Sequence, residues 1–366
     1  MSAMTQLKQR IASQKVQLKN LSTRIFKQHS LILSESTPFE IVAHNDYSKV
    51  RYYPAVSNRY LEPLVFVAPF AINMAIYDLF PYRSLVKHFQ NQGFDVYLVE
   101  WNHFRFRDRH IHFLTIIDYA LPDCINKIRS HAQSEQISLH GWSMAGIFVL
   151  LYSALRQPNF VKNLIILGSP IDSYASGFIG KVNQNMYRLI QKNTTLHQFL
   201  FSSHIPKKFT HTPGRLNSIG FKILDPKGWY ASYKTLLNNL DDLETISENA
   251  TISQFLNNMI DYPGGINQDM IFKIWLKNEL KYGVIQLEDK QIKLNSITSS
   301  LLIGAGQTDQ LVTEAAIKPL CELTNSQDVT FTLIPGGHLG LMSNKASAEQ
   351  FWPKLTSWLE QRSTKI

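Results

Sequence analysis

The sequence predicts an α/β protein built on a mostly parallel, doubly wound sheet. Short apolar segments alternate with helical segments through the first half of the chain, and the alternation resumes near the C-terminus. This alternation is typical of parallel strands that are joined by crossover helices. A serine between small residues directly after one of these strands adds a second observation, because it indicates a tight turn into a helix.

The expected elements follow one another along the chain. Residues 38–61 predict an extended hairpin that leads into the core. Apolar segments predict strands at 64–68, 95–101, 137–140, 161–167, 299–306 and 329–334. Helical periodicity predicts helices at 84–92, 116–130 and 349–361. Gly93 should close the first of these helices, since glycine accepts the left-handed conformation of a C-cap.

Ser143 lies in the turn after the strand at 137–140. Gly141 precedes it by two positions, and Ala145 and Gly146 follow it closely. A turn this tight pushes the serine Oγ out above the edge of the sheet, where it can attack a carbonyl carbon. The pattern resembles the nucleophile elbow of the α/β-hydrolase fold, with Ala145 in place of the usual second glycine.

An elbow serine needs a base, and the base needs an acid that orients it. Asp309 lies in the loop after the strand at 299–306, at the end of a parallel strand where ligand chemistry collects. His338 follows two glycines after the last strand. The order serine, acid, histidine is that of the hydrolase fold. We therefore expect Ser143 as the nucleophile, His338 as general base and acid, and Asp309 as the group that fixes the imidazole.

The oxyanion hole of such a site should use two backbone N–H groups. The residue after the nucleophile, Met144, supplies the first. The second should come from the loop after the strand at 64–68, with Phe70 as the first choice and Ala71 as the alternative. Pro69 is excluded because proline has no N–H.

Structural interpretations compete with these catalytic ones. A loop histidine is most often structural or solvated, and loop aspartates often only cap turns. The flanking glycines and the place after the last strand favour the catalytic interpretation of His338. His140 is interpreted as a strand residue that faces a helix, and the other histidines receive no role. Trp142 either lines an acyl pocket or packs in the core.

Length and composition set further bounds. The 366 residues exceed a minimal hydrolase core of about 200–250 residues, so the surplus is insertion or extension. The two cysteines, Cys124 and Cys321, are far apart and predict neither a disulfide framework nor a metal site. The sequence has no apolar run of about 18 residues and no signal-peptide core. We therefore expect a cytoplasmic protein that needs no metal or cofactor.

The net charge of +9 is uneven along the chain. Residues 1–34 hold six lysines and arginines and no acid, and their apolar residues recur at heptad-like spacing. This pattern predicts a basic amphipathic helix. The helix either packs on its own domain or docks onto a partner helix, an anionic membrane lipid or an apolar surface such as a granule. The rest of the chain is close to balanced, so no nucleic-acid partner is expected.

Four regions are expected along the chain. They are a basic N-terminal helix at 1–36, a first core part at 37–170, a cap at 171–295 and a second core part at 296–366. The alternation of strands and helices stops within 171–295, where helical periodicity takes over. An insertion at this place lies over the active site of a hydrolase-type fold and keeps water out of it.

Several segments share their sequence pattern with one known family. They are Thr37–Val42, Gln92–Trp101, Leu236–Leu240 and Asp261–Gly264, together with the order and spacing of Ser143, Asp309 and His338. From about Thr37 onward the chain resembles the catalytic subunit of polyhydroxyalkanoate synthases, especially the class III type that works with a second subunit. The resemblance implies polymerisation of (R)-3-hydroxyacyl-CoA into polyester through an acyl-enzyme, with release of CoA. It also implies a second synthase-type subunit or a homodimer.

The nucleophile departs from that family, which has a cysteine where this chain has Ser143 and a glycine where it has Ala145. A thiolate is the better nucleophile and leaving group, because a thiol has a far lower pKa than an alcohol. The leading hypothesis is a synthase-like acyltransferase that acts on hydroxyacyl-CoA thioesters or polyester chains. A serine esterase, thioesterase or polyester hydrolase is the second hypothesis. A non-catalytic paralogue that binds a synthase or a granule through its N-terminal helix is the third.

Overall fold

The computed structural model describes residues 3–57, 59–70, 72–201, 205–224 and 226–366. Its centre is an eight-stranded sheet with the order β1-β2-β4-β3-β5-β6-β9-β10. The strands are β1 (Glu40–His44), β2 (Ser48–Tyr53), β3 (Leu64–Val67), β4 (Val96–Trp101), β5 (Ile137–Trp142), β6 (Val161–Leu167), β9 (Ser300–Gly306) and β10 (Val329–Ile334). Strand β2 pairs antiparallel with both β1 and β4, and the remaining neighbours in the sheet, β4, β3, β5, β6, β9 and β10, run parallel. The predicted doubly wound sheet is confirmed.

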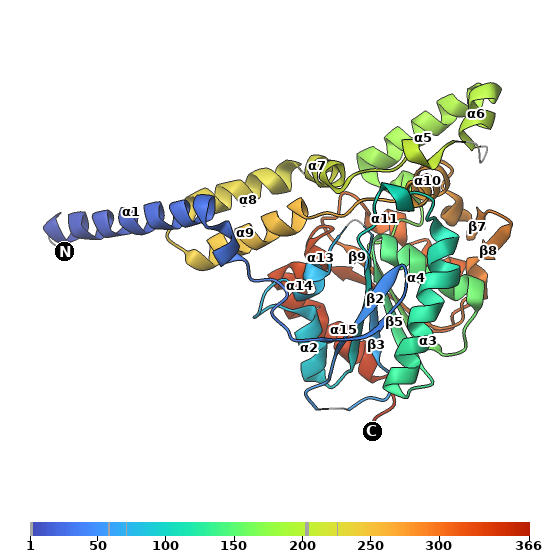
Figure 1. Ribbon diagram of the computed structural model, residues 1–366, viewed down its shortest axis with the longest axis horizontal. Helices are drawn as coiled ribbons and strands as arrows, with labels where there is room; N and C mark the ends of the chain where they lie inside the picture. Colours follow the sequence, from blue (N-terminus) through green and yellow to red (C-terminus); the bar gives the residue numbers. More distant parts are fainter. Residues whose placement is uncertain (1–2, 58, 71, 202–204, 225) are drawn as a thin grey trace.

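Helices cover both faces of this sheet (Figure 1). Helices α2 (Leu85–Gln92) and α15 (Trp352–Glu360) contact each other on one face, and α3 (Leu121–Ala132) and α4 (Met144–Arg156) lie on the other. The short helices α11 (Glu314–Ile317), α12 (Leu320–Leu323), α13 (Gly340–Ser343) and α14 (Lys345–Gln350) complete the C-terminal part. Strands β3 to β5 are buried along their whole length, as expected for parallel strands covered on both sides.

Helix α2 shows how local sequence sets these elements. The Ser84 hydroxyl accepts the N–H of Lys87 at 3.1 Å, which caps the first turn. Gly93 ends the helix with φ of 92°, a left-handed conformation that glycine adopts without a Cβ penalty. The predicted helix at 84–92 therefore begins one residue later, with Ser84 as its cap.

The predicted helix at 116–130 divides into two parts. Thr115–Ala120 forms a π-helical turn, and α3 follows it. Pro122 has no N–H, so it cannot donate to the carbonyl of Asp118 four residues earlier. Arg156 donates its Nη2 to that carbonyl oxygen instead, at 2.5 Å. The proline thus explains the irregular start of the helix.

Residues 171–295 fold mainly into helices above the sheet. They form α5 (Gly177–Lys192), α6 (Thr194–Phe201), α7 (Gly214–Leu224), α8 (Pro226–Asn238), α9 (Leu243–Asn257), α10 (Gly264–Gln268) and a π-helical turn (Asp269–Leu276). A hairpin of β7 (Val284–Leu287) and β8 (Lys290–Lys293) follows, which the purely helical expectation missed. Lys290 of this hairpin pairs with Asp118. The domain boundaries given above stay a prediction.

The N-terminal helix α1 (Ala3–Phe26) extends far from the sheet and runs beside α8 and α9 at its C-terminal end (Figure 1). There Asn20 donates its Nδ2 to the Leu240 carbonyl at 3.0 Å, and Arg24 donates to side chains of α9. Four buried residues form a small apolar cluster below it, separate from the main core: Leu31, Leu236, Ile246 and Ala250. Among the described residues, no helix has the length and apolar character to cross a membrane.

Candidate active site

Ser143 is the single residue between the end of β5 and the start of α4. Its backbone has φ of 58° and ψ of −126°, a conformation that costs a non-glycine residue about 1–3 kcal/mol. Two hydrogen bonds hold it there. The Ser143 N–H donates to the Leu167 carbonyl at 2.8 Å, and the Ser169 hydroxyl donates to the Ser143 carbonyl at 2.7 Å. Neighbouring strand β6 and its following loop therefore stabilise the strained turn.

The small residues around Ser143 are a steric requirement of this turn. A Cβ on Gly141 would lie 2.5 Å from the Ala145 carbonyl oxygen, and a Cβ on Gly146 would overlap the Ser169 Oγ. Ala145 is fully buried in the first turn of α4, where its methyl group is accommodated. The turn thus needs glycine at 141 and 146 and tolerates alanine at 145.

Ser143, His338 and Asp309 lie in one hydrogen-bonded line. His338 Nε2 is 2.9 Å from the Ser143 Oγ, and His338 Nδ1 is 2.7 Å from Asp309 Oδ2. An ionised carboxylate can only accept, so Nδ1 carries the ring proton and Nε2 is free to accept the serine hydroxyl. The structure therefore brings the three predicted residues together, from the ends of β5, β9 and β10.

The carboxylate of Asp309 is held firmly in its loop. Its Oδ1 accepts the N–H groups of Leu311 and Val312, both at 2.8 Å, and its residue is 3% exposed. Oδ1 of Asp309 thus caps the turn, while Oδ2 contacts His338. On the histidine side, Gly336 has φ of 110°, which lets the chain turn back after β10.

Trp142 packs directly on the histidine. Its ring centroid is 5.3 Å from that of His338, and its side chain is fully buried. Its Nε1 is buried with no hydrogen-bond partner among the described residues. The sequence left open whether Trp142 lines an acyl pocket or packs in the core. Its burial and its contact with His338 favour packing, which restricts the movement of the imidazole.

The two predicted oxyanion donors have different surroundings. Met144 begins α4, so its N–H is one of the amides at the helix start that lack a partner within the helix. Phe70 follows β3, and its buried ring stacks between Trp101 and Phe104 at centroid distances of 5.0 and 5.3 Å. Ala71, the alternative, lies outside the described residues. The oxyanion roles of Met144 and Phe70 stay predictions.

His140 is a core residue. It is fully buried in β5 and contacts the rings of Phe66 and Tyr77, the latter in a short helical turn, edge to face. Burial lowers the pKa of its imidazole to about 3, so the ring is neutral at ordinary pH. Among the described residues no group of three or more His, Cys, Asp or Glu side chains could hold a metal ion.

Sequence reasoning missed two features of the site. Ser169 holds the Ser143 carbonyl, and the only signal for it is a small polar residue after a parallel strand. A cavity of about 690 Å³ opens beside the loop that follows His338, between the core and helices α8 and α9, although none of Ser143, His338 and Asp309 lines it. Its wall includes these apolar and polar residues: Ile76, Leu79, Ser232, Ile252, Phe255, Leu256, Leu339 and Gly340. Leu339 and Gly340 directly follow the histidine.

The fold and the arrangement of Ser143, His338 and Asp309 are those of an α/β hydrolase. Residues 73–345 match the family model described as alpha/beta hydrolase fold. The chain belongs to that family. Among solved structures, a soluble variant of monoglyceride lipase from Saccharomyces cerevisiae is similar, with a TM-score of 0.59, 15% identity, and coverage of 91% of this chain and 96% of that one. The protein named DcsB, solved with its substrate analogue, has a TM-score of 0.53, 17% identity and coverages of 89% and 99%.

Comparison with curated proteins finds relatives that share one name. The chain is 26% identical over 332 residues to poly(3-hydroxyalkanoate) polymerase subunit PhaC of Haloferax mediterranei, covering 89% of this chain and 64% of the relative. It is 26% identical over 334 residues to PhaC of Synechocystis sp., covering 89% and 85%. The chain spans less than two thirds of the length of two of these relatives, 64% of PhaC from Haloferax mediterranei and 61% of PhaC from Haloarcula marismortui. These relatives support the resemblance to polyhydroxyalkanoate synthases over most of the chain.

Proposed function

We propose that the protein is a polyhydroxyalkanoate-synthase-like acyltransferase that forms an acyl-enzyme on Ser143 from hydroxyacyl-CoA thioesters or polyester chains. One observation carries the proposal. An unbroken line of hydrogen bonds leads from the Ser143 Oγ through His338 to Asp309, in a chain whose relatives are poly(3-hydroxyalkanoate) polymerase subunits.

Acylation begins with the Ser143 Oγ attacking the thioester carbonyl carbon. Its proton passes to His338 Nε2, 2.9 Å away, as the new C–O bond forms. Asp309 stabilises the resulting imidazolium through Nδ1. The C–S bond then breaks, the proton on Nε2 goes to the departing sulfur, and free CoA and an oxyester on Ser143 result.

The negative charge on the carbonyl oxygen needs stabilisation during this step. The Met144 N–H at the start of α4 is aimed by the same turn that exposes Ser143, and the helix start adds a favourable dipole. The second donor is the Phe70 N–H. Removing one such donor typically costs about 10²–10³ in rate.

Deacylation decides the product. A hydroxyl group gives its proton to His338 Nε2 and attacks the oxyester carbonyl. The bond between the acyl carbon and the Ser143 Oγ then breaks, and His338 Nε2 returns the proton to Oγ, which frees Ser143. If the hydroxyl belongs to another hydroxyacyl group, the polyester grows by one unit. If it belongs to water, a free acid is released.

The cavity beside the loop that follows His338 supports a substrate with an apolar acyl part. Ile76, Leu79, Phe255 and Leu339 contribute apolar surface to its wall, where an acyl chain could pack. The Arg83–Glu248 ion pair at 2.9 Å ties the core to α9 beside this cavity. A second synthase-type subunit or a homodimer remains a prediction.

The experiment supplies 3-hydroxybutyryl-CoA to the purified protein and follows both free thiol and insoluble polyester. We expect both products, and an intact-mass adduct that maps to Ser143. Ser143→Ala should give neither product nor adduct. Release of thiol without polymer contradicts the synthase function, and an adduct on another residue contradicts the nucleophile.

A second candidate is a serine esterase, thioesterase or polyester hydrolase on the same scaffold. The observation that favours it is Ser143 itself, because its oxyester intermediate is open to water and lacks the reactivity of a thioester. This function predicts hydrolysis of small p-nitrophenyl esters that Ser143→Ala abolishes. It also predicts free 3-hydroxybutyrate as the main product from the CoA ester, with no polymer.

A further inference from the structure

The positive charge of this chain is concentrated in its helical extensions. Residues 1–34 and 173–240 together hold 15 lysines and arginines and one acid, Asp225. The rest of the chain holds 22 lysines and arginines against 27 acids. The helical extensions are therefore strongly cationic and the remainder is mildly anionic, although the net charge of the whole chain is only +9.

Helix α5 presents an apolar stripe to solvent. Its members recur at spacings of three and four residues and so share one side of the helix. They are Phe178, Val182, Met186 and Leu189, with exposures from 41% to 81%. The exposed cations Lys181 and Arg188 flank the stripe.

Helices α7 and α8 repeat this pattern. On α7, Leu216, Ile219 and Ile223 are each more than half exposed. On α8, Tyr230 and Leu237 stand two turns apart and are 73% and 63% exposed. Arg215 on α7 and Lys234 on α8 are exposed beside them. We call the exposed side chains of α5, α7 and α8 the cap face.

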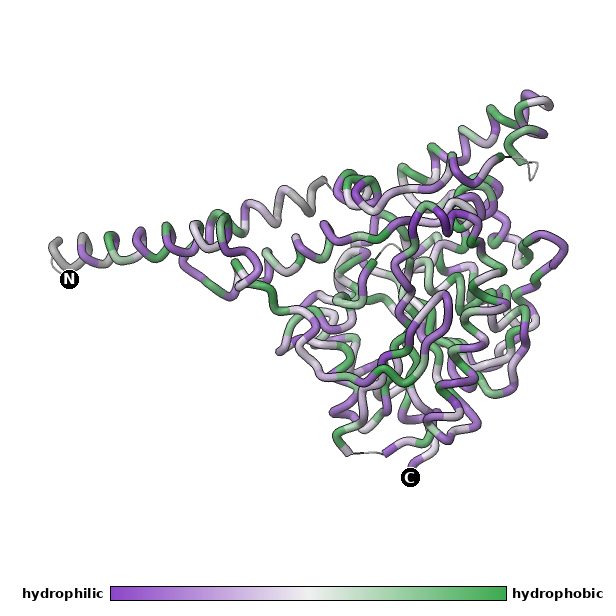
Figure 2. The backbone as a smooth tube through the Cα atoms, viewed as in Figure 1, coloured by the Kyte–Doolittle hydropathy of each residue, from purple (hydrophilic) through white to green (hydrophobic). Residues whose placement is uncertain are grey.

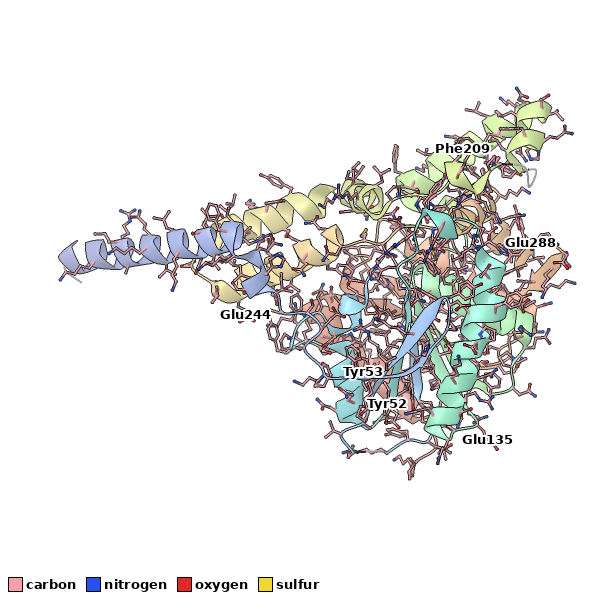
Figure 3. All side chains as sticks on the ribbon, viewed as in Figure 1. Tyr52, Tyr53, Glu135, Phe209, Glu244 and Glu288 are labelled. Carbon is pink, nitrogen blue, oxygen red and sulfur yellow. The ribbon has the colours of Figure 1, made fainter. Side chains whose placement is uncertain are left out.

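The three helices follow one another along a single edge of the molecule (Figure 1). In Figure 2, hydrophobic and hydrophilic positions alternate along α5 at this edge. Figure 3 places Phe209 on the same edge, and its side chain is 71% exposed. Glu135 lies at the opposite end of the molecule. The helices that carry these exposed apolar and cationic side chains therefore lie along one edge of the molecule (Figure 1).

The chemistry of the cap face selects its partner. Apolar side chains exposed in this number mark a docking surface, and no acid occurs between residues 173 and 224 to balance its cations. A second copy of the chain would bring the same cations together across a two-fold interface, which is repulsive. Nucleic acid would leave the apolar stripes against a polar partner. An anionic phospholipid surface supplies phosphates and hydrocarbon together.

We propose that the cap face binds anionic phospholipid surfaces, with α5, α7 and α8 lying in the plane of the headgroups. Their cations contact phosphates while the apolar stripes enter the acyl boundary. Ser232 of α8 and Phe255 of α9 line the cavity beside the loop that follows His338. Docking therefore holds the roof of the cavity against the lipid. The proposal concerns binding and does not depend on the acyl-transfer chemistry.

The test is co-sedimentation of the full chain with vesicles of equal parts phosphatidylcholine and phosphatidylglycerol, compared with phosphatidylcholine alone. We expect binding to the mixed vesicles that weakens as salt rises, and little binding to the neutral ones. Arg188→Glu with Arg215→Glu should weaken binding by at least about tenfold. Lys293→Glu with Lys354→Glu, which changes two exposed cations outside the cap face by the same charge, should leave binding unchanged.

The contribution of apolar side chains to lipid binding is tested with one variant of the cap face and one control variant. Phe178→Ser should weaken binding by about tenfold, because it removes an apolar ring from the contact. Tyr119→Ser removes a ring that is 68% exposed on the core and should leave binding unchanged. Both positions are exposed, so neither change disturbs the fold.

Three outcomes overturn the proposal. The wild-type chain fails to bind anionic vesicles, or the cap-face variants bind as well as their controls. In the third outcome the protein is a dimer without vesicle affinity, and Phe178→Ser dissociates it, which assigns the cap face to a second copy. Ser143→Ala is expected to bind vesicles like the wild type, so a failure of lipid binding and a failure of acyl transfer are told apart.

Discussion

The tautomer of His338 depends on Asp309, and Asp309→Asn tests this directly. Oδ1 of Asp309 accepts two backbone N–H groups, from Leu311 and Val312. The carbonyl oxygen of an asparagine would take this place, because its NH₂ group cannot accept them. The NH₂ group would then face His338 Nδ1 and donate to it. The ring would carry its proton on Nε2, which faces Ser143, and could no longer take the serine proton.

The expected loss is large while the fold stays intact. A misplaced tautomer of this kind costs about 10⁴-fold in kcat, or about 5.5 kcal/mol of transition-state stabilisation. The measurement is turnover of a p-nitrophenyl ester and of 3-hydroxybutyryl-CoA, with thermal unfolding as the check on folding. Asp328→Asn is the control, since Asp328 pairs with Arg362 at 2.6 and 2.8 Å away from the site. A loss below about tenfold in Asp309→Asn would refute the role given to this carboxylate.

Four further substitutions probe the elbow and its strand. Ser169→Ala removes one of two donors to the Ser143 carbonyl, since the Gly146 N–H still donates to it at 3.1 Å, and should lower the free energy of unfolding by about 0.5–1.5 kcal/mol in urea titration. Because a Cβ at Gly146 would meet the Ser169 Oγ, Gly146→Ala combined with Ser169→Ala should cost less than the sum of the two single changes. Strict additivity would contradict this contact. His140 has a pKa lowered to about 3 from 6.5, so only the unfolded chain takes its proton between these values and stability falls as pH drops through this window. His140→Leu should remove this share of the acid loss, and an unchanged slope of stability against pH would be inconsistent with a buried neutral imidazole. Ser143→Cys should raise polymer yield if the synthase function is right, as followed by insoluble polyester, and it should leave no polymer if the chain is a hydrolase.

The sheet and the three aligned side chains were predictable because each depends on short-range pattern. Buried parallel strands read as apolar runs, and the ends of β5, β9 and β10 meet at one edge of the sheet. Once the strands were placed, the residues that follow them had to lie close together. Ser143, Asp309 and His338 are within hydrogen-bonding distance for this reason.

Features that depend on distant contacts were not predictable from pattern. The hairpin of β7 and β8 has four-residue strands, too short for a clear alternation, and Lys290 anchors it to Asp118 far away in the sequence. The π-helical turn before α3 follows from Pro122 together with Arg156, 34 residues further on. The second basic segment escaped notice because the acids of the core balance it in the total. Only the fold shows that α5, α7 and α8, which carry these lysines and arginines, lie along one edge of the molecule (Figure 1).

The N-terminal helix α1 and the segment that follows it, called the arm below, pack against α8 and α9 through a small apolar cluster of their own. The cluster consists of Leu31, Leu236, Ile246 and Ala250. Four apolar side chains and a few hydrogen bonds hold the arm, against a main core that contains most of the buried side chains. The arm can therefore open while the sheet remains intact, since regions with few buried contacts unfold at lower free energy. Amide protons of α1 should exchange with solvent well before those of β5, so hydrogen exchange should show two groups of amides with different rates.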